Sequence, residues 1–503
     1  MATKSVLALC AAALIAGCIL GGLPENAAGG EKALGSLLQD AIQLEAGLEL
    51  THAATLYDEI LRRCGPTGPP DLALAAQQRL RRVASLRAGF AWSHADLDQA
   101  LAKAFSGYRP EDLSQWEARG WLYARDVDGQ KRYHVSDATN LAFFATTLRR
   151  RNSRLAEGDR LFAKVFLEAA AELNSRRRAG GPPQPYLLPQ TYVYTVKAVL
   201  HQADLPPGDV VRAWFPTPLE TPAAQNIRVV DVQPAGTPRL GPDVQATLGV
   251  IYLGVPRPRE GDLTVSIAIA FDTSHTDLDV DLHRIPPYDP QSEVYRRFTR
   301  SEPQIALNPK TVELARSIVG QEQNPYRQAR RLYDWVCQHC TYNYVWHQRD
   351  ATFTWGCASE EVRQRRIGDC VTQSMFYTAL CRSVGLPARV VNGPVFPPCF
   401  KNDHVWAEVL FPGWGWFPVD VTYSEVITMA PDLNGDQRRE LRDFFFGRTD
   451  RWRFCSQRDE LSQPLVPAKH SPRKRATMFT YPEFECGGRD VDKAVVTWDC
   501  RPR

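Results

Sequence analysis

A cysteine, a histidine and an aspartate in the C-terminal half of the chain have the types and the order needed for nucleophilic catalysis. Cys370 follows Gly368 and Asp369 and opens a segment whose apolar residues recur at helical spacing until Gly385, which predicts a helix with Cys370 in its first turn. Unpaired amide N–H groups and the positive end of the helix dipole favour a thiolate over a thiol at that position. Gly368 would also let a reacting carbonyl approach the backbone closely. We therefore predict that Cys370 is a nucleophile.

A predicted hairpin would place the other two residues. His404 heads a run of alternating residues that ends at Phe411, and a Pro-Gly-Trp-Gly turn leads to a second run that contains Asp420. A loop of three or five residues would put His404 and Asp420 on one face of the sheet, two residues out of register. A loop of two or four residues would put them on opposite faces. The sequence leaves both arrangements open.

Together, the three residues would form a thiol-based acyl-transfer site. Cys370 would attack an amide carbonyl, His404 would take the thiol proton and deliver it to the leaving amine, and Asp420 would hold the imidazole and stabilise its charged form. Taken singly, each residue fits a more ordinary role, as a small buried thiol, a hydrogen-bonded histidine or an acid that ends a strand. The ordered set on one helix and two strands is what indicates catalysis.

Several segments of this region resemble the transglutaminase-like superfamily. The residues that carry the resemblance are Gly368–Cys370, Ala379–Gly393, Asp403–Val409 and Gly415–Asp420. The resemblance covers Tyr326–Ser424 and implies a papain-like core with a Cys–His–Asp triad, whose roles fall on Cys370, His404 and Asp420. Val421 stands where the family usually has proline.

The same resemblance implies two further features. Members of the family often use an upstream aromatic residue near the oxyanion, and Tyr342, Trp346 and Trp355 are the candidates here. Phe444–Arg448 and Tyr481–Glu483 resemble segments that follow such cores in bacterial members. We therefore expect residues 431–503 to form a C-terminal extension that packs on the core.

The N-terminal residues predict export. An apolar run from Val6 to Leu20 follows the charge of Lys4, and Ile15–Cys18 resembles the lipobox of bacterial lipoproteins, in which the thiol of Cys18 would be acylated. A simple signal peptide and an uncleaved anchor within residues 1–24 are the alternatives. Each of the three puts the mature chain outside the cytoplasm. We expect an extracytoplasmic, membrane-anchored protein of the bacterial cell envelope.

The remaining cysteines could pair in such a compartment. Of the 12 cysteines, two lie in the N-terminal apolar run, which leaves ten. Cys337 and Cys340 form a C-x-x-C pair, which is half of a zinc site, and no second pair at suitable spacing follows. A disulfide from either of them to Cys357 or Cys399 would brace the loops around the cleft. The pairing cannot be read from the sequence.

We predict a multidomain α+β protein. Helical spacing predicts a helical domain at residues 31–180, and period-two alternation between Pro and Gly turns predicts a β-sandwich domain at 185–285. The papain-like transglutaminase core would take residues 290–430. The 60 basic and 57 acidic residues give a net charge of +3, which argues against nucleic-acid binding. Asp277–Asp281 and Asp432–Asp436 lack the full ligand set of a calcium loop, so we expect no metal and no cofactor.

These features predict an exported cysteine acyl-transfer enzyme that forms a thioester on Cys370 from protein or peptide amides. We expect hydrolysis, as in a protease or amidase, rather than amine crosslinking, as in a protein-glutamine acyltransferase. The membrane would be contacted through the lipid anchor, and the helical domain would recruit a protein partner. The alternative from another class is a non-catalytic, membrane-anchored lipoprotein that uses the core as a binding scaffold.

Overall fold

The computed structural model describes residues 30–65, 68–179, 184–344, 357–459, 463–471, 479–491 and 493–503. These residues fall into two units, of which the first contains residues 30–101 and 109–138 and the second contains the other described residues. The predicted lipidation site at Cys18 lies outside the described residues. None of the described helices combines the length and the apolarity that a membrane span requires.

Amphipathic helices build the first unit. In the segment 50–64, Leu50, Ala53, Tyr57 and Ile60 recur every three or four residues and are all buried, which is the pattern of a helix with one apolar face. The elements that lie in or begin in this unit are α2 (Gly30–Ala46), α3 (Leu50–Cys64), α4 (Pro70–Gly89), α5 (His94–Ala104), α6 (Asp112–Ala118), β1 (Arg125–Val127), β2 (Gln130–Arg132) and α7 (Asp137–Phe144).

Two five-stranded antiparallel sheets share one hydrophobic core in the second unit. The strands of the first sheet are β14 (Arg448–Thr449), β8 (Leu263–Asp277), β3 (Tyr186–Leu200), β18 (Val495–Pro502) and β5 (Ala224–Gln233), which pairs with β8. The strands of the second are β17 (Arg489–Asp490), β16 (Glu483–Cys486), β4 (Val210–Pro216), β7 (Val250–Pro256) and β6 (Arg239–Leu240). Alternate residues of β3, among them Tyr194 and Val196, face Phe215 and Ile251 of the second sheet across the core, so the two sheets form a sandwich.

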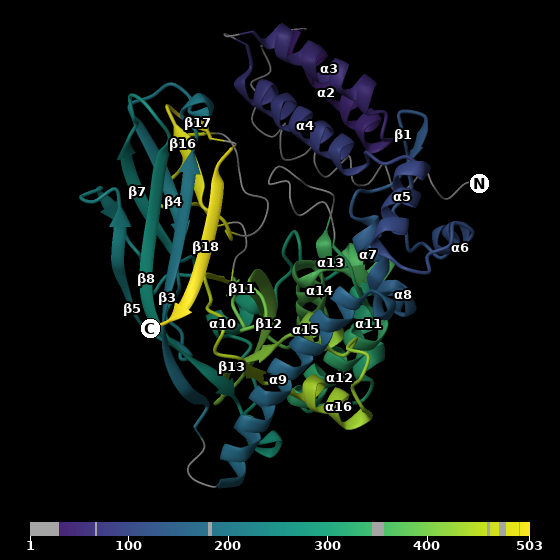
Figure 1. Cartoon of the computed structure of the whole chain (residues 1–503), viewed down its shortest axis with the longest axis vertical. Helices are drawn as coiled ribbons and strands as arrows, with labels where there is room; N and C mark the ends of the chain where they lie inside the picture. The colour runs from purple at the N-terminus through teal and green to yellow at the C-terminus, as the bar shows by residue number, and fades with distance from the viewer. Residues whose placement is uncertain are drawn as a thin grey trace. The chain divides into compact units, whose positions relative to one another are not determined.

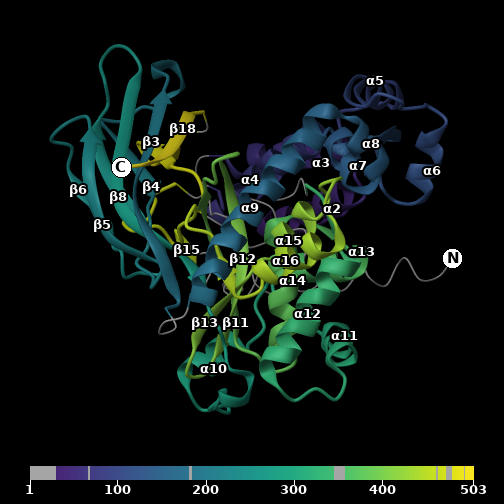
Figure 2. The same cartoon turned by 60° about the horizontal axis from the view of Figure 1, so that its bottom comes forward.

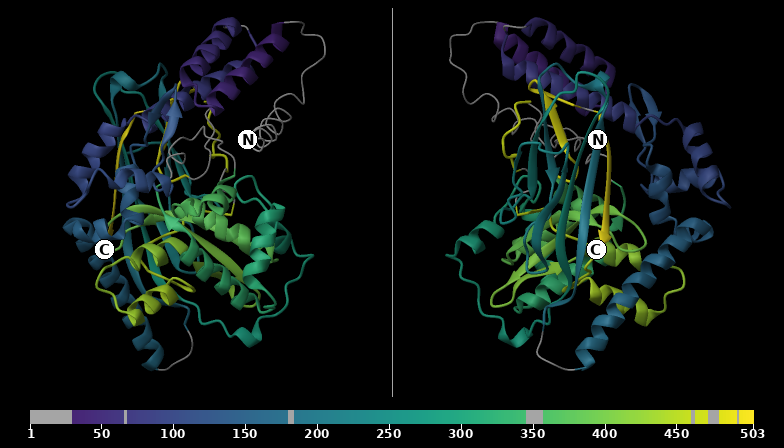
Figure 3. Two further views of the ribbon diagram at one scale, coloured as in Figure 1. Left: turned by 90° about the vertical axis from the view of Figure 1, so that its right-hand side faces the viewer. Right: turned by 60° about the vertical axis from the view of Figure 1, so that its left-hand side comes forward.

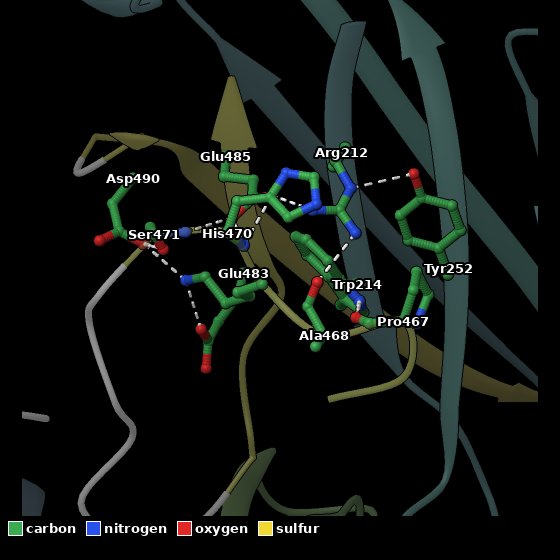
Figure 4. Close-up of polar contacts among 11 residues, drawn as sticks. Arg212, Trp214, Tyr252, Pro467, Ala468, His470, Ser471, Glu483, Glu485 and Asp490 are labelled. Carbon is green, nitrogen blue, oxygen red and sulfur yellow. Dashed lines mark hydrogen bonds and ion pairs between the residues drawn. The ribbon is translucent and has the colours of Figure 1, made fainter. Parts of the chain in front are cut away.

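The C-terminal segment belongs partly to this sandwich. We expected residues 431–503 to pack on the catalytic core, but β16 pairs with β4, and β18 pairs with β3 over eight residue pairs (Figures 1 and 3). The buried carboxylate of Glu485 also anchors the preceding loop to the sheet. It accepts hydrogen bonds from the backbone N–H of His470 at 2.9 Å and of Ser471 at 3.1 Å, and it pairs with Arg212 of β4 (Figure 4). Residues 483–502 therefore complete the two sheets.

A four-stranded sheet and its covering helices form the core that carries Cys370, His404 and Asp420. The sheet has the order β13 (Gly415–Val419), β12 (Asn402–Phe411), β11 (Ala388–Val395) and β15 (Gln457–Arg458). Helix α14 (Cys370–Ser383) packs on one face, where Val405, Ala407 and Val409 of β12 lie in the same apolar clusters as residues of the helix. The remaining elements of this part are η2 (Leu282–Arg284), α10 (Glu293–Phe298), α11 (Pro309–Val319), α12 (Pro325–His339), β9 (Thr341–Tyr342), α13 (Ala358–Arg365), β10 (Ile367–Gly368), α15 (Val421–Ile427) and α16 (Gly435–Phe444). The short helix η1 (Gln202–Asp204) lies between β3 and β4 of the sandwich.

Residues 139–179, which we expected within one helical domain, cluster with the second unit. They include most of α7, then α8 (Thr146–Arg151) and α9 (Ser153–Ala179). Phe166 of α9 is fully buried, and its ring contacts the rings of Tyr423, Phe444 and Phe445. Helix α9 thus lies against α15 and α16 of the core (Figure 2).

Candidate active site

Cys370 is the first residue of α14, as the sequence predicted. Asp369 caps the helix, and its Oδ1 accepts hydrogen bonds from the backbone N–H of Val371 and Thr372, both at 3.1 Å. The hydroxyl of Thr372 in turn accepts from the N–H of Asp369 at 3.0 Å, which completes a capping box. The amides that we expected to face a thiolate are therefore bound by a carboxylate.

This arrangement favours the thiol form of Cys370. Burial raises the pKa of the Cys370 thiol well above its ordinary value, and the carboxylates of Asp369 and Asp420 raise it further. The backbone amides of Val405 and Val371 oppose this shift only in part. Burial is the main cause of this raised pKa, and the charge of the capping carboxylate adds to it, so the position of Cys370 at the helix start does not by itself favour the thiolate.

Gly368 is required by packing. A Cβ at this position would lie 2.5 Å from Thr372 Oγ1 and 2.8 Å from Val362 Cγ2. The close approach of neighbouring side chains therefore accounts for glycine before the nucleophile.

The hairpin loop has three residues, so one of the two open arrangements is realised. Phe411 pairs with Gly415 and Ala407 pairs with Val419, which puts His404 and Asp420 on the same face. Nε2 of His404 lies 2.8 Å from Oδ2 of Asp420, and both residues are buried.

The imidazole of His404 is held on two sides. The ring of Tyr423 stacks on it with 3.9 Å between centroids and 24° between planes. With Nε2 bound to Asp420, Nδ1 is the nitrogen that remains for proton exchange. The Cys370 thiol lies beside the backbone amide of Val405, the residue after His404. The structure thus brings the three predicted residues together.

Asp420 makes two further contacts besides its bond to His404. It is the N-cap of α15, and its Oδ1 accepts from the N–H of Tyr423 at 3.0 Å. Its Oδ2 also accepts from Nη1 of Arg453 at 3.0 Å. Burial opposes ionisation of Asp420, but His404, Arg453 and the Tyr423 amide hold its pKa below the ordinary value. Asp420 therefore remains a carboxylate, the form that can orient the imidazole.

The second strand of the hairpin is shorter than we predicted. It ends at Val419, and the residues after Asp420 begin α15. Val421 is the first residue of this helix, the position at which proline is favoured. This explains why valine can replace the proline that is usual in the resembling family without displacing Asp420.

Arg453, Asp450 and Tyr423 complete the surroundings of the pair, and sequence reasoning missed all three. Arg453 follows Asp420 by 33 residues and belongs to no recognisable motif. Tyr423 carried a weak signal, because its amide is three residues after an acid that can cap a helix. Nothing in the sequence connected Arg453 or Asp450 to the hairpin.

Of the three oxyanion candidates, the structure describes Tyr342. Tyr342 pairs with Gly368 in a short parallel bridge, and burial raises the pKa of its phenol, with Cys370 as the next contributor. Tyr342 therefore lies in the neighbourhood of Cys370. Trp346 and Trp355 lie outside the described residues.

A buried acid supports the backbone in this neighbourhood. Oε1 of Glu425 accepts from the N–H of Tyr342 at 2.5 Å, and Oε2 accepts from Nε2 of Gln373 at 3.0 Å. The same Gln373 amide donates to the carbonyl of Gly368 at 3.0 Å. Burial raises the pKa of Glu425 to about 8, against the effect of these two donors.

The ten cysteines in the described residues are all free. The bridges that we considered between Cys337 or Cys340 and Cys357 or Cys399 do not form in this structure. Burial raises the pKa of Cys337 to about 12, so its thiol stays protonated. Within the described ranges, no three His, Cys, Asp or Glu side chains are placed to hold a metal ion.

Comparisons with known proteins agree with the motifs. Residues 312–421 match the model of the transglutaminase-like superfamily. An uncharacterized protein of Haemophilus influenzae is 24% identical over 238 residues, a match that covers 40% of this chain and 60% of that protein. The chain thus spans three fifths of the length of this relative.

Two solved structures are also similar to the chain. A candidate cysteine protease from Cytophaga hutchinsonii has 14% sequence identity and a TM-score of 0.37, with 63% of this chain and 93% of that chain covered. The periplasmic domain of TgpA from Pseudomonas aeruginosa has 16% identity and a TM-score of 0.25, with 52% of this chain and 93% of that chain covered. On the family match, the chain contains a transglutaminase-like domain at residues 312–421.

Proposed function

We propose that this protein is a cysteine enzyme that forms a thioester on Cys370 from a peptide or side-chain amide and then hydrolyses it. The observation that carries the proposal is the 2.8 Å contact between Nε2 of His404 and Oδ2 of Asp420, on a hairpin packed against the helix that Cys370 begins. This arrangement supports the roles of nucleophile for Cys370, base for His404 and orienting acid for Asp420.

The protons balance in two half-reactions. In the first, the thiol proton of Cys370 passes to Nδ1 of His404 while the sulfur attacks the amide carbonyl. The imidazolium then protonates the leaving amine as the C–N bond breaks. In the second, His404 takes a proton from water, the hydroxide oxygen attacks the thioester, and the proton returns to the leaving sulfur. Because the resting thiol is favoured, the first proton transfer accompanies the attack.

Water is the acceptor that we propose, in preference to a primary amine. Water needs no binding site of its own, whereas an amine acceptor has to be bound and oriented next to the thioester. Amine transfer is therefore the competing outcome that the experiment must measure.

The test is turnover of a peptide library in the presence and absence of a primary amine, with wild type, Cys370→Ala, His404→Ala and Cys486→Ala. We expect hydrolysis by wild type, no turnover without Cys370, and a loss of about 10²–10⁴-fold without His404. Cys486→Ala removes a buried thiol of β16 in the sandwich and should keep wild-type activity. Amine incorporation in excess of hydrolysis would identify a crosslinking enzyme. A folded wild type with neither reaction would favour the scaffold lipoprotein.

We also propose that Cys18 is acylated and that the chain acts at the bacterial cell envelope. The N-terminal sequence Ile15–Cys18 supports this proposal. Mass spectrometry of the N-terminal peptide from membranes tests it. Cys18→Ser should move the protein from the membrane fraction to the soluble fraction, and an unchanged distribution would contradict lipidation.

A further inference from the structure

One oxygen of Asp420 is shared by two side chains. Its Oδ2 lies 2.8 Å from Nε2 of His404 and accepts a hydrogen bond from Nη1 of Arg453 at 3.0 Å. Arg453 is 5% exposed, so solvent does little to screen its charge from the pair. A carboxylate that already neutralises a guanidinium holds a proton on a neighbouring imidazole less strongly than a free carboxylate does.

Arg453 is fixed by contacts on several sides. Its Nε and Nη2 donate to Oδ2 of Asp450, at 2.9 Å and 2.5 Å. Its guanidinium carbon lies 5.0 Å from the ring centre of Trp406 and 5.3 Å from that of Tyr423. Tyr423 is also the ring that stacks on His404. The guanidinium therefore has one defined place beside the pair.

The other groups that face the pair come from three further elements. Cys370 and its capping acid Asp369 belong to the start of α14, Tyr342 belongs to β9, and Tyr423 belongs to α15. None of these groups is a cation. Among the described residues, Arg453 and His404 are the basic side chains that bind Asp420.

We propose that Arg453 is a positioning residue that lowers the proton affinity of His404 through Asp420, and so disfavours transfer of the Cys370 proton to His404 before an amide binds. The proposal deepens the acyl-transfer function above and depends on it for the roles of Cys370 and His404. Loss of the guanidinium should therefore increase the fraction of thiolate–imidazolium pair at acidic pH.

The experiment measures two quantities that require no turnover. The first is the titration of the His404 imidazole by NMR, assigned with a His404→Gln variant. The second is the rate of Cys370 alkylation by iodoacetamide against pH, followed by peptide mass spectrometry. In Arg453→Met we expect the midpoint of the His404 titration to rise by about one pH unit and the rate of Cys370 alkylation at pH 6 to increase about tenfold. Arg453→Lys keeps the charge but loses the planar fork of donors, so the midpoint of its His404 titration should lie between those of wild type and Arg453→Met.

Arg389→Met is the matched control. Arg389 is also buried, pairs with Glu408 at 2.7 Å and Asp459 at 2.8 Å, and stacks on Trp416 with 3.9 Å to the ring centre, but it does not contact Asp420. Arg389→Met should leave the midpoint of the His404 titration unchanged.

Arg453→Met leaves Asp450 without its ion-pair partner, so a double variant with Asp450→Asn keeps the test valid if the single variant unfolds. The folded state is checked by circular dichroism, because an unfolded chain would react with the ordinary thiol midpoint near pH 8.5. An unchanged or lowered His404 titration in a folded Arg453 variant would overturn the proposal. A raised midpoint of the His404 titration in a protein without turnover would support the role of Arg453 and contradict the proposed acyl-transfer function.

Discussion

The carboxylate of Asp369 caps the helix that Cys370 begins, and the same carboxylate adds to the rise that burial causes in the pKa of the Cys370 thiol. Asn is as good an N-cap as Asp but carries no charge. In Asp369→Asn we therefore expect the midpoint of Cys370 alkylation to fall by about one pH unit, with little change in stability. The pH dependence of iodoacetamide labelling and the thermal midpoint measure the two effects.

Asp369→Ala separates the cap from the charge. It removes the charge as well and should lower the alkylation midpoint too, but losing the cap should cost about 1 kcal/mol of stability. An alkylation profile that is the same in wild type and Asp369→Asn would show that the carboxylate does not act on the thiol.

Glu425 makes stability fall as the pH rises. Burial raises its pKa from 4.5 to about 8, so between these values the folded chain binds a proton that the unfolded chain has lost. Stability from this group is complete below the unfolded pKa and is lost as the pH rises towards 8, by at most about 1.4 kcal/mol per pH unit. Glu425→Gln cannot titrate and should flatten the dependence.

Urea unfolding at pH 5.5, 6.5 and 7.5 measures this slope. Glu157→Gln, an exposed acid on α9, is the control and should keep the wild-type slope. Equal slopes in wild type and Glu425→Gln would mean that Glu425 is ionised in the folded protein throughout this range.

Gly393 lies opposite His404 in the β11–β12 register and leaves no room for a side chain. A Cβ there would lie 1.8 Å from the carbonyl oxygen of Phe454. Gly393→Ala should therefore displace the segment that carries Arg453 and destabilise the protein by on the order of 3 kcal/mol. Gly158→Ala on α9 meets no atom within 4 Å and should instead stabilise it by about 0.5–1 kcal/mol. Thermal unfolding of both variants gives the comparison, and a neutral Gly393→Ala would contradict the packing.

Phe166 couples helix α9 to the site. Its buried ring contacts Tyr423, which stacks on His404. We expect Phe166→Ala to cost about 3–5 kcal/mol and to slow alkylation of Cys370, because Tyr423 loses its support. Leu161→Ala, on the same helix but 44% exposed, should change stability by less than about 0.5 kcal/mol. Loss of stability with full thiol reactivity would show that α9 does not position the site.

The parts of the site that follow local rules could be predicted from the sequence. The apolar spacing after Cys370 and the Gly at its end define α14, because helix periodicity and capping are short-range. The hairpin with His404 was also predictable, but its loop length was not, since several lengths suit the same turn residues. The observed register then fixed the relation of His404 to Asp420.

The parts that depend on distant contacts could not be predicted. Arg453 reaches Asp420 because the segment after β14 folds back onto the sheet, and its charge alone resembles that of any surface arginine. The residues of β18 alternate too briefly to identify their partner, which is β3. The expectation that residues 431–503 pack on the core therefore fits residues 457–458, which pair with β11, and fails for residues 483–502.

The division of the sandwich between two distant segments has a consequence during synthesis. Strand β8 ends at Asp277 and β16 begins at Glu483, so about 200 residues that include the transglutaminase-like domain are made between them. At about 5–20 residues per second, this takes roughly 10–40 s. Throughout that interval β3 presents an unpaired edge, which is a template for association with other chains. Two processes therefore compete with folding until β18 has been synthesised. A chaperone can bind the nascent chain, or the free edge of β3 can pair with another chain.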